Sequence, residues 1–121
     1  MQQPLLAGFR AGPEPTVFIV NVIHAQPGKQ EEAFRLIQDV VNYVAERKEG
    51  FLWSNLSKST DGKTVVNIEA IAGEGNVEEF FSDAVFLEKF GALQSVSTCE
   101  FHTYRVDDLV LPKRAALAAS A

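Results

Sequence analysis

The sequence contains very little cysteine: Cys99 is the only one among 121 residues. A single cysteine cannot form a disulfide within the chain, which predicts a protein of the reducing cytoplasm. The sequence also lacks the roughly 18 uninterrupted apolar residues that a membrane-spanning helix needs. Its first residues show no basic segment followed by an apolar core, so a secretory signal is not predicted. These absences predict a cytoplasmic protein without a membrane partner.

Basic residues are scarce and scattered. The chain has 11 Lys and Arg against 16 Asp and Glu, a net charge of −5. Because nucleic acid requires a clustered basic surface, no nucleic-acid partner is predicted. The only histidines, His24 and His102, lie far apart in the sequence, and no Cys/His cluster has the spacing of metal ligands. A metal site is therefore not predicted.

The length fits one domain, and 46% hydrophobic residues is ordinary for a globular one. Residues 1–15 carry three prolines and two glycines without periodicity, which predicts a flexible N-terminal arm. The domain is predicted over 16–111. Residues 112–121 begin with proline and are rich in alanine, which predicts a flexible C-terminal tail.

The first half of the domain predicts a strand, a helix and a hairpin. Residues 16–25 are mostly β-branched and apolar, as in a buried strand. Apolar residues within 29–48 recur at steps of three and four, which predicts a helix. Residues 51–60 and 63–72 predict two strands, joined by the hairpin dipeptide Asp61-Gly62.

The second half predicts another helix and a last strand. Asn76, with Glu79 three residues later, resembles a capping box, and Gly91 is expected to end the helical region. Residues 94–106 predict the last strand. The order βαββαβ indicates an α+β, ferredoxin-like fold with an antiparallel sheet and both helices on one face. The other face then needs a cover, and a second copy of the chain is the simplest one, so a homodimer is predicted.

Strand alternation divides each strand into two sets of side chains. We expect the wholly apolar sets to face the helices. The opposite sets would then gather on the helix-free face and include Asn21, Trp53, Asn55, Asn67, Glu69, Ile71, Glu100, His102 and Tyr104. An aromatic wall with a few hydrogen-bonding groups is typical of a small-molecule site. Phe81 and its aromatic neighbours in the second helical region are expected in the core or at the entrance of that site.

The same residues could instead form a dimer interface, with each polar group satisfied by the partner chain. Burying Asn21, Asn67 and Glu69 without partners would cost about 1–3 kcal/mol each. A ligand, water or a partner chain must therefore satisfy them, and the residues leave these possibilities open.

Residues 50–70 resemble the antibiotic biosynthesis monooxygenase family. The resemblance rests on the segments Gly50-Phe51-Leu52, Ser59-Thr60-Asp61-Gly62 and Val65-Val66-Asn67, and extends over about 16–110. It implies a dimeric α/β barrel. It is strongest to the family's quinone-forming, actinorhodin-type members, which oxidise a phenolic ring with molecular oxygen and no cofactor.

The resemblance implies that Asn67 is catalytic and stabilises an oxyanion or a peroxide. Ile71 and Ser57 stand where such members have a tryptophan and a histidine. The general base would then be His102 or Glu69. Haem-degrading members need a helix histidine and a strand tryptophan, and here Phe90 and Ile71 stand at those places, so haem is not predicted.

The sequence thus predicts a cofactor-independent monooxygenase. Its substrate would be a polycyclic phenol or an anthrone in aromatic polyketide tailoring. Asn67, His102 and Glu69 would be catalytic, and the substrate would contact Asn21, Trp53, Asn55, Ile71, Phe81 and Tyr104. A cyclase or isomerase that needs no oxygen, and a binding protein without catalysis, are the alternatives.

Overall fold

The structure is a computed structural model that describes residues 16–72 and 78–113. The predicted arm at 1–15 lies outside the described residues, as do residues 114–121 of the predicted tail. The capping box expected at Asn76 also falls outside them.

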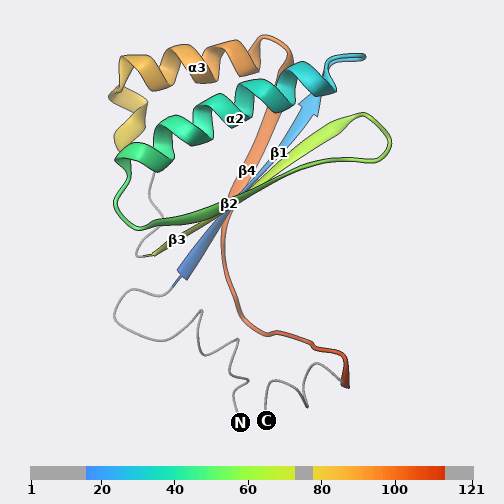
Figure 1. The fold of residues 1–121 in the computed structure, drawn as a ribbon, viewed down its shortest axis with the longest axis vertical. Helices are drawn as coiled ribbons and strands as arrows, with labels where there is room; N and C mark the ends of the chain where they lie inside the picture. The colour runs from blue at the N-terminus through green and yellow to red at the C-terminus, as the bar shows by residue number, and fades with distance from the viewer. Residues whose placement is uncertain (1–15, 73–77, 114–121) are drawn as a thin grey trace.

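One four-stranded antiparallel sheet carries two helices (Figure 1). Its strands lie in the order β2-β3-β1-β4. The elements are β1 (Thr16–Ala25), α2 (Gln30–Arg47), β2 (Phe51–Lys58), β3 (Thr64–Ala72), the 3-10 helix η1 (Glu78–Ser82), α3 (Ala84–Gln94) and β4 (Ser97–Arg105). This confirms the predicted α+β, ferredoxin-like fold.

Two glycines shape the turns of the first half. Gly50 follows α2 with a φ of +83°, and a Cβ at this position would lie 2.7 Å from the carbonyl oxygen of Ala72. Only glycine fits there, because both the backbone conformation and the space exclude a side chain. Gly62 has a φ of +78°, and the Asp61 carboxylate beside it accepts a hydrogen bond of 2.9 Å from the backbone nitrogen of Lys63. The predicted hairpin is confirmed.

The bounds of α3 differ from those expected. The helix continues through Gly91 to Gln94, and Leu93 in its last turn is fully buried. Asp83 caps its start, accepting hydrogen bonds of 2.9 and 3.0 Å from the backbone nitrogens of Val85 and Phe86. The prediction that Gly91 ends the helix is wrong, because burial of Leu93 outweighs the modest cost of an interior glycine.

In β1 and β3, the set of side chains that faces the helices is the opposite of the one predicted. Both helices lie on the same side of the sheet (Figure 1), and the strand residues buried beneath them are Val17, Ile19, Asn21, Ile23, Val65, Asn67, Glu69 and Ile71. The wholly apolar sets, such as Phe18, Val20 and Val22, point to the other face and are half-buried. Alternation separates two sets, but it cannot say which set meets the helices when both are largely apolar.

The pairing register places the residues of β2 and β4. Val20 pairs with His102 and Asn21 with Phe101, so the His102 side chain lies on the face away from the helices. Trp53 lies on that open face too, with its ring 5.8 Å from the ring of Phe18. The prediction that all the polar and aromatic residues share one face is therefore wrong.

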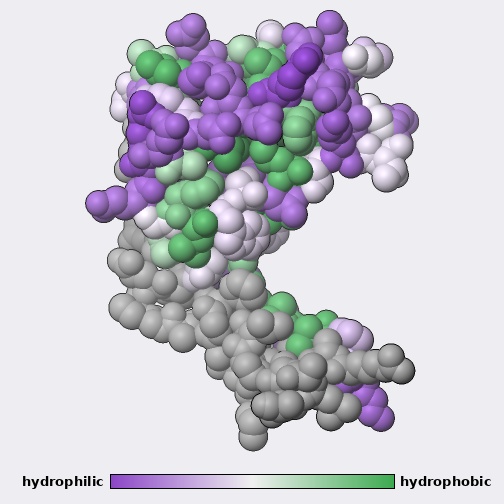
Figure 2. All heavy atoms as spheres, viewed as in Figure 1, coloured by the Kyte–Doolittle hydropathy of each residue, from purple (hydrophilic) through white to green (hydrophobic). Residues whose placement is uncertain are grey.

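The helical layer is hydrophilic on its outer surface, and the opposite face of the sheet is open. Figure 2, in the view of Figure 1, shows many hydrophilic residues over the helical layer. Glu31 and Arg35 of α2 are exposed. No described element covers the open face of the sheet, where Trp53 and Tyr104 are 45% and 50% exposed. Among the described residues, no helix is both long and apolar enough to cross a membrane.

Candidate functional site

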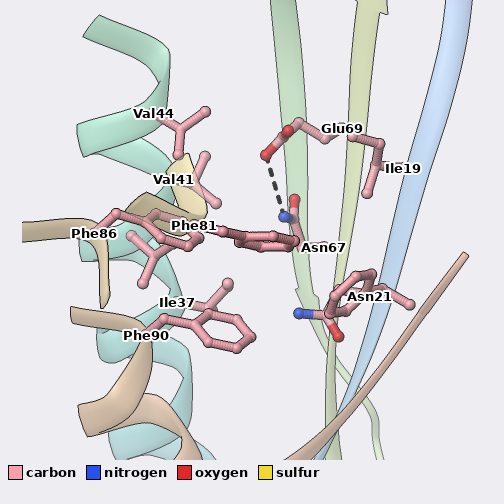
Figure 3. A pocket seen from close by; sticks show the side chains of 12 residues that line it. Ile19, Asn21, Ile37, Val41, Val44, Asn67, Glu69, Phe81, Phe86 and Phe90 are labelled. Atoms are coloured by element: carbon pink, nitrogen blue, oxygen red, sulfur yellow. Dashed lines mark hydrogen bonds between the residues drawn. The ribbon is translucent and has the colours of Figure 1, made fainter. Parts of the chain in front are cut away.

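A cavity lies between the sheet and the two helices (Figure 3). The centre of a water molecule can occupy about 60 Å³ of it, and the free space is about 510 Å³ when the open solvent at its mouth is counted. Its sheet side carries three polar residues, and its other walls are apolar. The lining residues are Ile19, Asn21, Ile37, Val40, Val41, Val44, Asn67, Glu69, Phe81, Phe86, Phe90 and Phe101.

Asn67 and Glu69 lie on the same face of β3 and touch each other. The Asn67 Nδ2 donates a hydrogen bond of 3.4 Å to the Glu69 Oε1, drawn as the dashed line in Figure 3. From β2, the Ser54 hydroxyl donates to the Asn67 Oδ1. Each side chain of Asn67 and Glu69 is only 5% exposed. The three residues therefore form a short chain of hydrogen bonds at the floor of the cavity.

Burial changes the acidity of Glu69. Loss of water around the carboxyl raises its pKa above the ordinary value of 4.5, since the charged form is the one that burial penalises. The Asn67 hydrogen bond and the positive charge of Lys48 act in the opposite direction, with a smaller effect. Glu69 is thus a carboxyl that can hold or release a proton nearer to neutral pH than an exposed one.

Asn21 supplies a second amide from β1, directly opposite Asn67 in the register. Its side chain is 5% exposed, and within the described residues its Oδ1 has no hydrogen-bond partner. A buried carbonyl oxygen without a partner costs about 1–3 kcal/mol. Such a group in a cavity wall is a ready acceptor for a hydrogen-bond donor that enters the cavity.

Aromatic rings form the wall opposite these amides. Phe86 and Phe90 of α3 stack with their centroids 5.7 Å apart, and Phe81 of η1 lies 6.3 Å from Phe86. Phe101 of β4 meets the Phe90 ring edge-on at 6.5 Å. Figure 3 shows Phe81, Phe86 and Phe90 facing Asn21 and Asn67 across the cavity. Flat, apolar walls of this kind suit a planar aromatic ligand.

Four of the nine predicted site residues line this cavity: Asn21, Asn67, Glu69 and Phe81. Trp53, Asn55, His102 and Tyr104 lie on the open face of the sheet. His102 is in contact there with Glu100, at 3.5 Å from its Oε2. Ile71 is buried on the helix side but is not among the lining residues. Of the two predicted bases, only Glu69 reaches the cavity.

Sequence reasoning did not include Ser54 or Phe101 in the site. Ser54 is the one polar residue between Leu52 and Leu56 in an otherwise apolar alternating set, which is a signal that could have drawn attention to it. Phe101 follows from the register of β4, which the sequence does not provide.

The cavity combines a buried carboxyl, two amides and an apolar wall. A carboxylate in this setting can remove a proton from a bound molecule, and amide NH₂ groups can stabilise the anion that results. Over residues 16–72 and 78–113, no three His, Cys, Asp or Glu side chains lie close enough together to hold a metal ion. Among the described residues, the groups suited to chemistry here are therefore the carboxyl and the amides.

Comparisons with known proteins agree with this fold. SnoaB from Streptomyces nogalater, a cofactor-independent oxygenase studied as a variant with one asparagine replaced by alanine, is 22% identical; the match covers 81% of this chain and 98% of SnoaB, with a TM-score of 0.67. A conserved protein from Methanosarcina mazei Go1 is 18% identical over 74% of this chain and 91% of its own, with a TM-score of 0.62. None of the curated proteins compared matches the sequence.

A sequence model of the family described as "Antibiotic biosynthesis monooxygenase" matches residues 16–70, which include β1, α2, β2 and the part of β3 that carries Asn67 and Glu69. The finer likeness to the actinorhodin-type members stays a prediction from the sequence. Residues 16–70 are thus similar in sequence to the antibiotic biosynthesis monooxygenase family, and the fold is shared with SnoaB.

Proposed function

We propose that this protein is a cofactor-independent monooxygenase that oxidises a polycyclic phenol or an anthrone-like substrate with molecular oxygen, in the tailoring of an aromatic polyketide. The observation that carries the proposal is the meeting of Asn21, Asn67 and Glu69 in one aromatic-walled cavity. The match of residues 16–70 to the family model and the fold shared with an oxygenase support it.

The reaction begins with a proton transfer. The Glu69 carboxylate takes a proton from the activated CH₂ of an anthrone, leaving a carbanion delocalised into the neighbouring carbonyl. The Asn67 NH₂ stabilises the negative charge on that oxygen, and the Asn21 Oδ1 accepts a hydrogen bond from a phenolic hydroxyl. These contacts hold the ring against the phenylalanine wall.

The electrons for oxygen come from the substrate. The carbanion passes one electron to O₂, and the resulting radicals combine to a C–O bond and a peroxide. Glu69 returns its proton to the peroxide anion, and loss of water from the hydroperoxide leaves the quinone carbonyl. Overall, CH₂ and O₂ become C=O and H₂O: the carbon gives up four electrons, and the two oxygen atoms accept them.

Oxygen uptake tests the proposal. Anthrone- and hydroquinone-like substrates are supplied to the purified protein at an oxygen electrode, with quinone absorbance read in parallel. We expect uptake above the protein-free rate, and a decrease of about 10²-fold in Asn67→Ala, the usual effect of removing one anion-stabilising donor. Asn42→Ala, an exposed substitution on α2, should leave the rate unchanged.

The same groups also favour a second function, because proton transfer by Glu69 does not itself need oxygen. A cyclase or isomerase would turn over at the same rate without oxygen. Binding of the aromatic compounds with no turnover would identify a non-catalytic binding protein. Either result, or no uptake with any of the substrates, contradicts the monooxygenase proposal.

A homodimer is part of the proposal. The open face presents the half-buried side chains Phe18, Val20, Val66 and Ile68 beside the exposed Trp53. Leaving such a face in water forfeits about 25 cal/mol for each Å² of apolar surface, which a second copy would recover by packing its own sheet against it.

A further inference from the structure

We propose that Ser54 is a positioning residue of the cavity, whose hydroxyl holds the Asn67 amide with its NH₂ turned toward Glu69. The inference rests on the proposed function only in that Asn67 and Glu69 perform the chemistry. Nothing in the sequence comparisons points to Ser54.

A β-bulge brings Ser54 to this place. Phe51 pairs with Ile71, but the register then shifts, so that Trp53 pairs with Ala70 and Ser54 with Glu69. With one extra residue in β2, both Phe51 and Ser54 point to the helix side, whereas strict alternation would have put Trp53 there. Bulges often redirect a side chain in this way beside a functional site.

The hydrogen bonds fix which way the Asn67 amide points. The Ser54 hydroxyl donates to Oδ1, which leaves Nδ2 to donate to Glu69 at 3.4 Å. In the flipped amide, Oδ1 would face the Glu69 carboxyl, and two oxygens would repel when that carboxyl is ionised. A protonated Glu69 would accept the flipped amide, because its hydroxyl could donate to Oδ1. With Glu69 ionised, the hydrogen bond from Ser54 to Oδ1 and the hydrogen bond from Nδ2 to Glu69 favour the same orientation. Without the Ser54 hydroxyl, Oδ1 loses this donor, and the amide is held less firmly.

This orientation affects Glu69 as well as any bound anion. The Asn67 hydrogen bond stabilises the ionised carboxylate and so lowers the pKa of Glu69, against the larger effect of burial. If the amide turns freely, that stabilisation weakens, and Glu69 should release its proton at a higher pH. A side chain that only fills space would leave this titration where it is.

The test is an NMR titration of the Glu69 side-chain carboxyl carbon in the protein without substrate. In Ser54→Ala we expect the midpoint to move to higher pH, and in Ser54→Thr, which keeps a hydroxyl, to return to the wild-type value. The matched control is Ser57→Ala. Its hydroxyl, also on β2, donates to Asn55 Oδ1 at 2.6 Å on the open face, and its removal should not move the midpoint.

Activity gives the second measurement. The loss of one positioning hydrogen bond should lower kcat about 3–10-fold in Ser54→Ala and change KM much less, with recovery in Ser54→Thr. An unmoved midpoint in Ser54→Ala overturns the inference even if the enzyme consumes oxygen. A moved midpoint in a protein that shows no turnover supports it while the proposed function fails. If Ser54→Ala does not fold, Ser54→Cys replaces it, because a thiol is a weaker donor of similar size. The midpoint of the Glu69 titration in Ser54→Cys should then be higher than in the wild type. A wild-type midpoint in Ser54→Cys also overturns the inference.

Discussion

Asn21 is buried, and none of the described residues provides a hydrogen-bond partner for its carbonyl oxygen. This predicts a variant that is more stable but less active. Asn21→Leu keeps the shape of the side chain and replaces the amide with two methyl groups. The unpartnered oxygen costs about 1–3 kcal/mol in the folded protein. Its removal also loses the contact of the amide with the Cys99 thiol, a weak hydrogen bond.

The net expectation is a gain of about 1–2 kcal/mol in the free energy of unfolding. For a domain of this size that corresponds to a rise in Tm of about 3–6 °C. Turnover should fall at least 10-fold, because the substrate loses its acceptor. A site that is strained when empty commonly shows this exchange of stability for function.

Urea unfolding and calorimetry measure the stability, at equal protein concentrations because a dimer depends on concentration. Asn42→Leu on the exposed side of α2 is the control and should change stability by no more than about 0.5 kcal/mol. A loss of stability in Asn21→Leu would mean that the oxygen is satisfied in the native protein. Unchanged turnover would mean that Asn21 does not contact the substrate.

Two further predictions concern Glu69 and the open face. Burial raises the pKa of Glu69 in the folded protein above 4.5, its value in the unfolded chain. The stability of the wild type should therefore fall as the pH rises from 4.5 through the folded pKa. Glu69→Gln should remove this loss of stability and should also end turnover. Equal pH dependence of urea midpoints in the two proteins would contradict it. Val20 lies on the open face of β1, one of the two inner strands. Val20→Glu should remain folded by circular dichroism but have the mass of one chain by light scattering. The wild type and the control Gln38→Glu, exposed on α2, should have the mass of two chains. A wild-type monomer at micromolar concentration would refute the homodimer.

The sequence determined the elements and their order, because these depend on local signals. The β-branched run of β1, the helical spacing of Ile37, Val41 and Val44, and the Asp61-Gly62 turn each act within a few residues. The order βαββαβ then leaves few sheet topologies, and the observed one follows. Asn21, Asn67 and Glu69 stood out in advance as polar residues in apolar strands.

Tertiary structure alone decided which face of the sheet these residues share with the helices. Both sets of side chains in β1 and β3 are apolar enough to be buried, so alternation could not choose between them. The register of β4 separated His102 from Asn21, and the bulge in β2 placed Ser54 on the same side of the sheet as Phe51. Pairing register and bulges arise from contacts between segments that are distant in the sequence. For this reason the sequence could predict the polar residues of the cavity but not the side of the sheet on which the cavity lies.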